Sequence, residues 1–249
     1  MPWTYGDTWS DCYDEFAALF NKDADTPAIV EFLSSYHFQG TAFEMGIGHG
    51  HIAIALADAG FAVSGIDNSA KMIESLHKRR GDSPVNAWVE DICSFSLMQS
   101  PDLIYCINGV LTYLLTQDDQ IRCFENVAAV MHQDSVFIVQ QNYPQTNDFT
   151  GNGIYGDQKT NVLHVSDNEV LVRFTKQDRQ NQWFLSQDIW VSGKQTMLLP
   201  QVSRYIFPSE LDLLARLVGL KLKERFWGWR REAFSSAAWK YVSVYSKGK

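Results

Sequence analysis

Two alternating patterns between residues 41 and 143 restrict the possible folds of this chain more than any other feature. Short apolar runs typical of buried strands occupy residues 41–45, 61–67, 85–91, 102–108 and 135–143. Helical patterns separate most of these runs, at residues 51–59, 69–80 and 116–132. Strands that alternate with helices of this length form βαβ units. The pattern therefore predicts an α/β fold in which helices cover both faces of a parallel sheet.

Helical patterns also flank this region. Apolar residues recur at three- and four-residue spacing in residues 7–21, and a second helix is predicted at residues 26–37. Thr26 is the expected N-cap of the second helix, because Pro27 follows it at the first helical position. Near the C-terminus another helix is predicted to begin after Ser209 and to end before Gly219, with Ser209 as its N-cap.

The alternation of strand and helix patterns ends after residue 143. Residues 142–158 are rich in Asn, Gly and Asp, which predicts a loop. Four strand-like runs follow, separated by short turn signals, at residues 161–166, 169–175, 183–192 and 195–207. Two more strands are predicted at residues 220–227 and 239–246. We therefore expect one domain, residues 1–249, in which an antiparallel β meander is inserted into the α/β core.

The composition argues against several classes of protein. A formal net charge of −8 disfavours a nucleic-acid partner, which would require a basic face. The cysteines, Cys12, Cys93, Cys106 and Cys123, include no C-x-x-C pair, which predicts reduced thiols and no zinc site. No apolar run approaches the ~20 residues of a membrane helix, and the N-terminus does not read as a signal peptide. We therefore expect a cytoplasmic protein without a membrane partner.

The segment FEMGIGHGH, residues 43–51, places Gly46, Gly48 and Gly50 between the first predicted strand and its helix. Open α/β sheets bind ligands at this carboxyl end of their strands. Glycine lets backbone N–H groups approach a ligand closely and permits positive φ. Three glycines within five residues are more than a tight turn requires. We interpret the segment as a ligand-binding loop.

The glycines alone do not identify the ligand. A dinucleotide fingerprint that starts at Gly46 fails, because its third glycine position is His51. Gly48, Gly50 and Ala53 nevertheless fit the looser G-x-G-x-x-A form, so NAD stays possible at this stage. Asp67, at the end of the second strand, can bind a ribose in either case.

Two further acids distinguish the ligands. Glu44 precedes the glycines, where a carboxylate would repel a phosphate near the helix N-terminus and attract a cation. Asp91 ends the third strand and is followed by Ile92, so it can accept from an adenine amino group while the apolar neighbour packs on the ring. A ligand with adenine, a ribose diol and a charged amino acid, but no phosphate, fits these groups. S-adenosylmethionine (SAM) is such a ligand.

At residues 42–143 the chain resembles the class I SAM-dependent methyltransferases. The resemblance rests on four motifs in order: FEMGIGHG, GIDNSAKMI, VEDI and DLIYCINGVLTYL. It implies a Rossmann-like fold, in which a mostly parallel seven-stranded sheet is flanked by helices and carries the inserted meander. It also implies SAM as the cofactor.

The resemblance assigns roles to individual residues. Gly46 and Gly48 would lie against the methionine part of SAM, Asp67 would bind the ribose hydroxyls, and Asn68 would flank the adenine. Asn108 would offer its carbonyl to the amino group. The full set of expected cofactor residues is Tyr13, Glu44, Gly46, Gly48, Gly50, Asp67, Asn68, Asp91, Ile92 and Asn108. His49 and His51 depart from the small residues usual in this loop, and we interpret them as solvated loop residues.

The remaining segments point to a small-molecule acceptor. The meander resembles the lid of small-molecule methyltransferases such as antibiotic-sugar N-methyltransferases, and Tyr5, Trp9 and Tyr13 resemble the flap that closes over SAM. The implied parts are an N-terminal helical flap (1–40), a SAM-binding core (41–143), a loop and meander lid (144–207), and a C-terminal helix with the last two strands (208–249). A homodimer, if formed, is expected to use the β insertion. The aromatic segment 225–239 either lines a substrate pocket or, as we favour, packs as a hairpin.

The chemistry of methyl transfer leaves the acceptor open. The reaction is an in-line displacement, so a base is optional for amines and more useful for hydroxyls or acidic carbons. The candidate bases are Tyr113, Tyr143, Tyr155 and His164. No carboxylate cluster suggests a magnesium-dependent enzyme. Two alternatives persist: a protein that binds SAM without transferring methyl, and a nicotinamide-dependent reductase.

Overall fold

A seven-stranded sheet forms the body of the protein in the computed structural model, which describes residues 4–20, 25–37, 39–145, 149 and 157–248. The strand order is β10-β11-β5-β4-β1-β2-β3. The bounds are β1 Thr41–Met45, β2 Ala62–Asp67, β3 Asn86–Val89, β4 Leu103–Cys106, β5 Val136–Asn142, β10 Leu220–Phe226 and β11 Lys240–Lys247. Strand β11 runs antiparallel to both of its neighbours, and the other pairs are parallel. The predicted α/β fold is confirmed.

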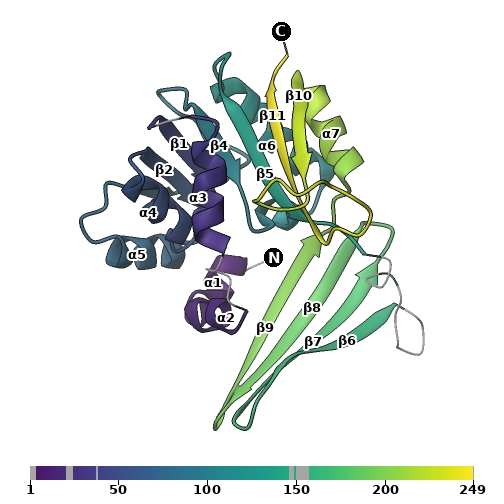
Figure 1. Cartoon of the computed structure of the whole chain (residues 1–249). Coiled ribbons are helices and arrows are strands. Elements are labelled where there is room, and N and C mark those ends of the chain that lie inside the picture. The colour runs from purple at the N-terminus through teal and green to yellow at the C-terminus, as the bar shows by residue number, and fades with distance from the viewer. Residues whose placement is uncertain (1–3, 21–24, 38, 146–148, 150–156, 249) are drawn as a thin grey trace.

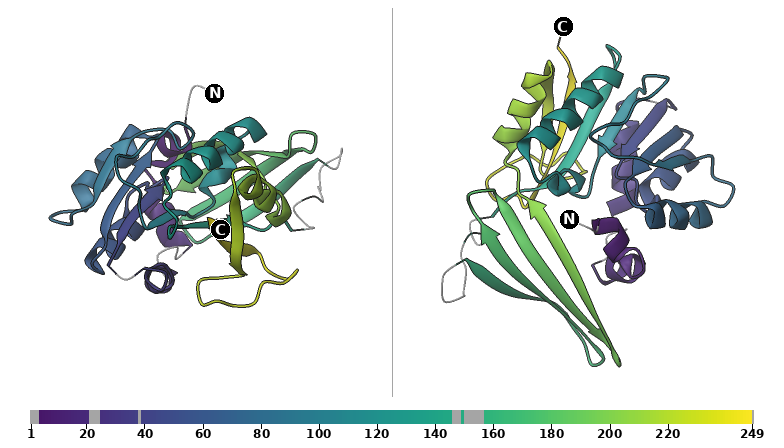
Figure 2. Two further views of the ribbon diagram at one scale, coloured as in Figure 1. Left: turned by 90° about the horizontal axis from the view of Figure 1, so that it is seen from above. Right: turned by 180° about the vertical axis from the view of Figure 1, so that it is seen from behind.

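Helices cover both faces of this sheet (Figures 1 and 2). They are α3 Thr26–Ser34, α4 His51–Asp58, α5 Ala70–Arg79, α6 Gln117–Val130 and α7 Pro208–Leu217, and a short 3₁₀ helix, η2, spans Val110–Tyr113. Because side chains alternate along a strand, β1 sends Ala42 into the core under α3 and α4. Its neighbour Phe43 enters the opposite core, under α6 and α7.

Several predicted helix ends differ from those observed. Ser69 and Thr116 cap α5 and α6 as N-cap residues, with side chains that accept from Met72 N and Asp119 N. The N-cap of α3 is Asp25 instead of Thr26, and that of α7 is Phe207 instead of Ser209. Both helices have a proline in the first turn, where its fixed φ suits the helix, and this residue determines where each one begins.

The first predicted helix is broken into two. Helix α1 spans Tyr5–Trp9 and α2 spans Tyr13–Leu19, with a turn between them in which Cys12 N donates to Trp9 O at 3.1 Å. The break lets two apolar rings, Trp9 and Phe16, pack together with centroids 4.6 Å apart. In a continuous helix, residues seven positions apart are separated by roughly 10 Å along the axis, so the rings would not pack in this way.

The predicted meander is confirmed as a separate four-stranded antiparallel sheet. Its strands are β6 Gln158–Val165, β7 Glu169–Asp178, β8 Trp183–Ser192 and β9 Gln195–Arg204. The meander projects from the edge of the main sheet at which the parallel strands end, and α1 and α2 lie in the angle between the two sheets (Figures 1 and 2). Much of the predicted loop 142–158 lies outside the described residues.

Polar contacts of Trp183 and Arg204 anchor the base of the meander. Trp183 Nε1 donates to the carbonyl of Leu115, just after η2, at 2.9 Å. Arg204 is 3% exposed and donates to Gln120 at 2.9 Å and to Glu210 at 2.6 Å, which ties β9 to α6 and α7. Within the residues that can be described, no helix is long and apolar enough to cross a membrane.

Candidate active site

The glycine loop between β1 and α4 is built for close approach by a ligand. Gly46 and Gly48 have φ of 74° and 54°, a region that side-chain-bearing residues rarely adopt. A Cβ at Gly46 would lie 2.6 Å from the Val110 side chain, so packing alone requires glycine there. A Cβ at Gly48 would meet no atom within 4 Å. Gly48 therefore faces open space, as a loop that cradles a ligand requires.

Asp67 is fixed in orientation by the backbone. Its Oδ2 accepts from Gly48 N at 3.0 Å, and its Oδ1 accepts from Ser69 N at 2.9 Å. Burial raises the pKa of this carboxyl, although the two backbone N–H groups oppose the shift. Each oxygen keeps a free lone pair, so the carboxylate can accept from two neighbouring hydroxyls, as a ribose diol presents them.

Glu44 is a buried acid with few partners. It is 4% exposed, and its Oε2 accepts a hydrogen bond from the Tyr105 hydroxyl at 3.0 Å. Burial raises the pKa of Glu44 well above its usual range, and the nearby charge of Asp67 adds to the effect. A cation bound at this edge would compensate the buried charge. The site therefore fits the cationic amino acid of SAM better than a phosphate.

The other expected cofactor residues follow the same edge of the sheet. Asp91 is exposed after β3 and accepts from Cys93 N at 2.8 Å through Oδ1, while Ile92 is buried. Asn68 is exposed after β2. Asn108 is exposed after β4 with φ of 57°, and its N–H donates to the Gln140 side chain at 2.7 Å.

His49 does not lie in solvent, so our interpretation of it as a solvated residue is wrong. It is 3% exposed, its Nδ1 lies 3.0 Å from Asp14 Oδ1, and its ring packs edge-on against Tyr13 at 5.1 Å. The reason is that α2 covers the loop, and Arg79 binds Asp14 from the other side. His51 is half-buried and lines a cavity of about 210 Å³ between the loop and α2.

The N-terminal helices are fastened beside Asp67. Ser69 Oγ donates to Asp7 Oδ1 at 2.7 Å, and a Cβ on Gly6 would lie 2.5 Å from the Ser69 Cβ, so α1 lies directly on the start of α5. Tyr5 stacks on Tyr113 of η2, with ring centroids 4.6 Å apart. Helices α1 and α2 therefore cover the loop and the end of β2, as a flap over a cofactor would.

The comparisons with known proteins agree with this geometry. Residues 42–134 match the family model described as a methyltransferase domain. The CcbJ methyltransferase from Streptomyces caelestis has a similar structure, with a TM-score of 0.90 and 27% identity over 99% of this chain and 98% of that one. The chain is a class I SAM-dependent methyltransferase. SAM is its cofactor, and Gly48 with Asp67 and Glu44 fits it as described above.

Two further proteins that this chain resembles are also methyltransferases. Cypemycin N-terminal methyltransferase from Streptomyces sp is 23% identical over 224 residues, which are 89% of this chain and 88% of that protein. CalS10, an amino pentose methyltransferase from Micromonospora echinaspora, was solved with SAM bound. It shares the fold, with a TM-score of 0.69 and 13% identity over 94% of this chain and 96% of that one.

The candidate bases of the methyltransferase lie in different surroundings. Tyr113 lies under the flap against Tyr5, and burial raises its pKa. Tyr143 packs on the C-terminal aromatic rings of Phe234 at 5.5 Å and Tyr241 at 6.3 Å. His164 lies near the turn that follows β6, with Nε2 3.7 Å from Glu169. Tyr155 lies outside the described residues.

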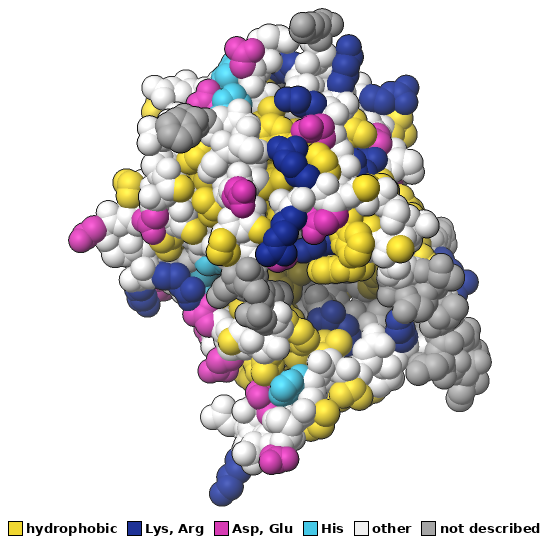
Figure 3. All heavy atoms as spheres, in the orientation of Figure 1, with side chains coloured by type: hydrophobic (Ala, Val, Ile, Leu, Met, Phe, Trp, Pro, Cys, Tyr) yellow, Lys and Arg dark blue, Asp and Glu magenta, His cyan; other side chains and the backbone are white. Residues whose placement is uncertain are grey.

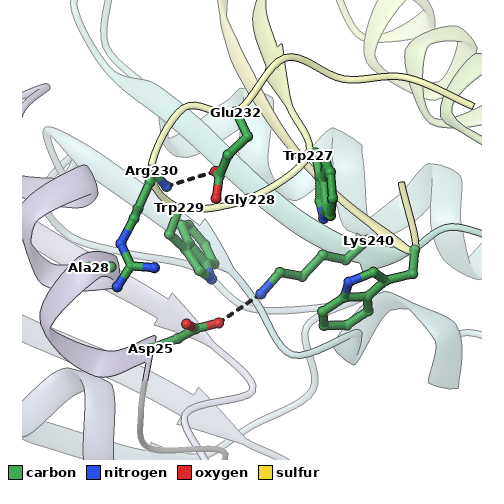
Figure 4. Close-up of a pocket in the computed structure, with 9 residues that line it drawn as sticks. Asp25, Ala28, Trp227, Gly228, Trp229, Arg230, Glu232 and Lys240 are labelled. Atoms are coloured by element: carbon green, nitrogen blue, oxygen red, sulfur yellow. Dashed lines mark hydrogen bonds and ion pairs between the residues drawn. The ribbon is translucent and has the colours of Figure 1, made fainter. Parts of the chain in front are cut away.

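The aromatic segment 225–239 of the methyltransferase both packs and lines a cavity. Trp229 is buried and packs on Phe32 of α3 at 5.4 Å, as expected for a hairpin. Trp227 and Trp239 line a cavity of about 230 Å³, across which Lys240 reaches toward the start of α3 (Figure 4). There its Nζ binds Asp25 at 2.7 Å. This cavity shares no lining residue with the one beside His49.

Some residues of the site could not be found from the sequence. Tyr105 lies in a buried strand, and only the register Glu44↔Tyr105 shows that it meets the acid. Asp14 and Asp7 occupy an amphipathic helical pattern, in which acids are normally solvated. In the part of the chain that the structure describes, no group of three or more His, Cys, Asp or Glu side chains could hold a metal ion.

Proposed function

We propose that this methyltransferase transfers the methyl group of SAM to an amine nitrogen of a small molecule. The supporting observation is the protonation state of Tyr5 and Tyr113, the phenols of the flap and of η2. Burial raises the pKa of both Tyr5 and Tyr113, so these phenols stay protonated at neutral pH. A neutral amine carries its own lone pair and needs no protein base for displacement, whereas a hydroxyl or a carbon acid benefits from one.

The names of the relatives support the same choice. One is an N-terminal methyltransferase and another acts on an amino pentose, so both names refer to amine-bearing molecules. The structural likeness to CcbJ extends over both sheets, because it covers 99% of this chain. We propose that the acceptor binds between the main sheet, the flap and the meander.

The roles of the residues follow from positioning. SAM supplies a methyl group on a sulfonium, which is transferred by in-line displacement. Asp67 holds the ribose, Glu44 offsets the positive charge, and we assign Asn68, Asp91 with Ile92, and Asn108 to the adenine and amino ends. The flap, with Tyr13, excludes water and so favours alignment of the acceptor. A carbon–nitrogen bond forms as the carbon–sulfur bond breaks, and the amine then releases its proton to solvent.

A panel of matched acceptors tests the proposal. The protein is incubated with SAM and with amines, phenols, carboxylates and activated carbon acids, and methylated products are identified by mass spectrometry. We expect methylation of amines, at a rate that rises with pH through the pKa of the acceptor amine. The same pH profile is expected for Tyr113→Phe, because the hydroxyl takes no proton. Methylation of phenols or carbon acids but not of amines would overturn the proposal.

A further inference from the structure

The inner face of the meander changes from apolar to polar toward its base. At its outer part, Leu171, Trp190 and Leu199 pack against Trp9 and Phe16 of the flap helices. Residues two positions apart on a strand share a face. The same face therefore continues on the three strands with polar side chains, and these are Arg173, Asp188, Thr175, Ser186 and Gln201.

Arg173 and Asp188 form a buried, bidentate ion pair on this face. Arg173 Nε and Nη2 donate to the two carboxylate oxygens of Asp188, each at 2.7 Å, and the residues are paired in the β7–β8 register. Asp188 is 0% exposed, while the Arg173 side chain is 28% exposed. A guanidinium has five N–H donors, and the pair occupies two of them. The exposed part of Arg173 therefore offers unused donors to the space in front of the face.

Two residues further toward the base of the meander, the same face contains Gln201, whose amide donor lacks a hydrogen-bond acceptor among the described residues. Thr175 Oγ1 and Ser186 Oγ lie 3.0 Å apart across β7 and β8. Gln201, opposite Ser186 on β9, is 8% exposed, and its Nε2 is buried with no hydrogen-bond acceptor among the described residues. Buried amide donors are normally satisfied. An unpaired amide donor beside an ion pair and two hydroxyls indicates a surface that can bind a polar ligand.

This face lies opposite the flap and η2. The charge of Arg173 acts on the hydroxyls of both Tyr5 and Tyr113 and opposes the rise in their pKa values that burial causes. The Trp183 bond to Leu115 holds the same sheet against the end of η2. Figure 3 shows a hollow between the body and the meander, in which Lys or Arg side chains are visible. The polar face therefore lies beside η2, which carries Tyr113.

We propose that Arg173, Asp188, Thr175, Ser186 and Gln201 bind a hydroxyl or carbonyl group of the methyl acceptor and thereby orient its amine. Because Asp188 neutralises Arg173, the pair offers donors without a net positive charge. An uncharged oxygen group fits it better than a carboxylate, which would meet the Asp188 charge. The two hydroxyls can both donate and accept, and Gln201 supplies the remaining donor. This inference rests on the proposed function, since it names what the acceptor carries besides its amine.

Three ring amines of similar size test the inference: aminocyclohexanol, cyclohexylamine and aminocyclohexane carboxylate. Initial rates with SAM are compared for the wild type and two variants, Gln201→Leu and the double variant Arg173→Met/Asp188→Leu. The double change removes both charges together, because leaving Asp188 buried and unpaired would threaten folding. Gln195→Leu, the same change at an exposed position of β9, is the control.

We expect the wild type to prefer aminocyclohexanol. Each variant should raise the KM for aminocyclohexanol about tenfold, the effect of one lost hydrogen bond to a partly charged site. The KM for cyclohexylamine should not change. SAM affinity, measured by calorimetry, should not change. The inference is overturned if the wild type prefers the carboxylate or shows no preference, or if the variants keep the wild-type preference.

The failure of the proposed function can be recognised separately. If no amine is methylated, binding of cyclohexanol and cyclohexane is compared by calorimetry with the demethylated cofactor product bound. Preference for the alcohol that Gln201→Leu abolishes would support the polar face even though the amine acceptor was wrong. Equal binding of the two compounds would reject the polar face as well.

Discussion

At the scale of single residues, Asp67 carries the clearest expectation for cofactor binding. Its two oxygens are already oriented by Gly48 N and Ser69 N, so the side chain loses little conformational entropy when a ribose diol binds. Asp67→Ala removes two charge-assisted hydrogen bonds, worth ~1.5–3 kcal/mol each, and should weaken SAM binding at least about 100-fold. Calorimetry measures this loss, and Asp58→Ala, an exposed acid on α4, is the control. A variant that keeps wild-type affinity would show that the ribose lies elsewhere.

Replacing Glu44 by glutamine should raise the stability of the protein without ligand and lower its affinity for SAM. Its pKa in the folded protein is raised by burial, so its contribution to stability is fully present below the ordinary glutamate pKa of about 4.3 and is lost as pH rises through the folded value. Without SAM, Glu44→Gln should therefore be more stable than the wild type at neutral pH and no more stable in acid. It should also bind SAM more weakly, while adenosine, which lacks the cationic groups, is affected less.

Thermal unfolding, measured as the pH is raised from near the ordinary glutamate pKa of about 4.3, tests the first effect. Titration with SAM and adenosine measures the second. If Glu44→Gln loses stability at neutral pH without ligand, the acid is charged and already satisfied in the folded protein. Equal losses for the two ligands would mean that Glu44 does not distinguish their charge.

At the scale of elements, Asp14 of α2 is one of the residues that hold the flap to the glycine loop. Burial alone would raise the pKa of Asp14, but hydrogen bonds with His49 and Arg79 outweigh it and lower the pKa. A lowered pKa means that this contact is present above the ordinary aspartate value and is lost as pH falls through the folded one. Helix α2 therefore stays docked over the loop at neutral pH.

Asp14→Asn should loosen the flap without changing the residues that touch SAM. We expect dissociation of SAM to become several-fold faster in stopped-flow fluorescence, with a smaller effect on association, because a lid mainly governs escape. Asp11→Asn is the control, since Asp11 is exposed and its ion pair with Lys71 at 3.3 Å is worth little. Equal dissociation rates in Asp14→Asn and the wild type would show that α2 does not retain the cofactor.

At the scale of the whole molecule, the sequence predicted what depends on local period and missed what depends on register. Both sheets and most helices were predicted because alternation with period 2 or 3.6 is visible within a few residues. The Glu44–Tyr105 and Arg173–Asp188 contacts join residues on different strands, and they exist only because the strands pair as they do. His49 was misjudged because the helix that buries it, α2, begins far away in the sequence, at Tyr13.

Among the residues that the structure describes, the two sheets share no hydrogen-bonded strand pair, and this separation affects how the protein can evolve. The expected cofactor residues lie along the main sheet, whereas the proposed acceptor contacts project from the meander, whose base is hydrogen-bonded to the body through Arg204 and Trp183. Substitutions at the polar part of the inner face, among Arg173, Asp188, Thr175, Ser186 and Gln201, change no hydrogen bond of Asp67 or Glu44. A lineage can therefore exchange one acceptor for another by drift in the smaller sheet while its use of SAM is inherited intact.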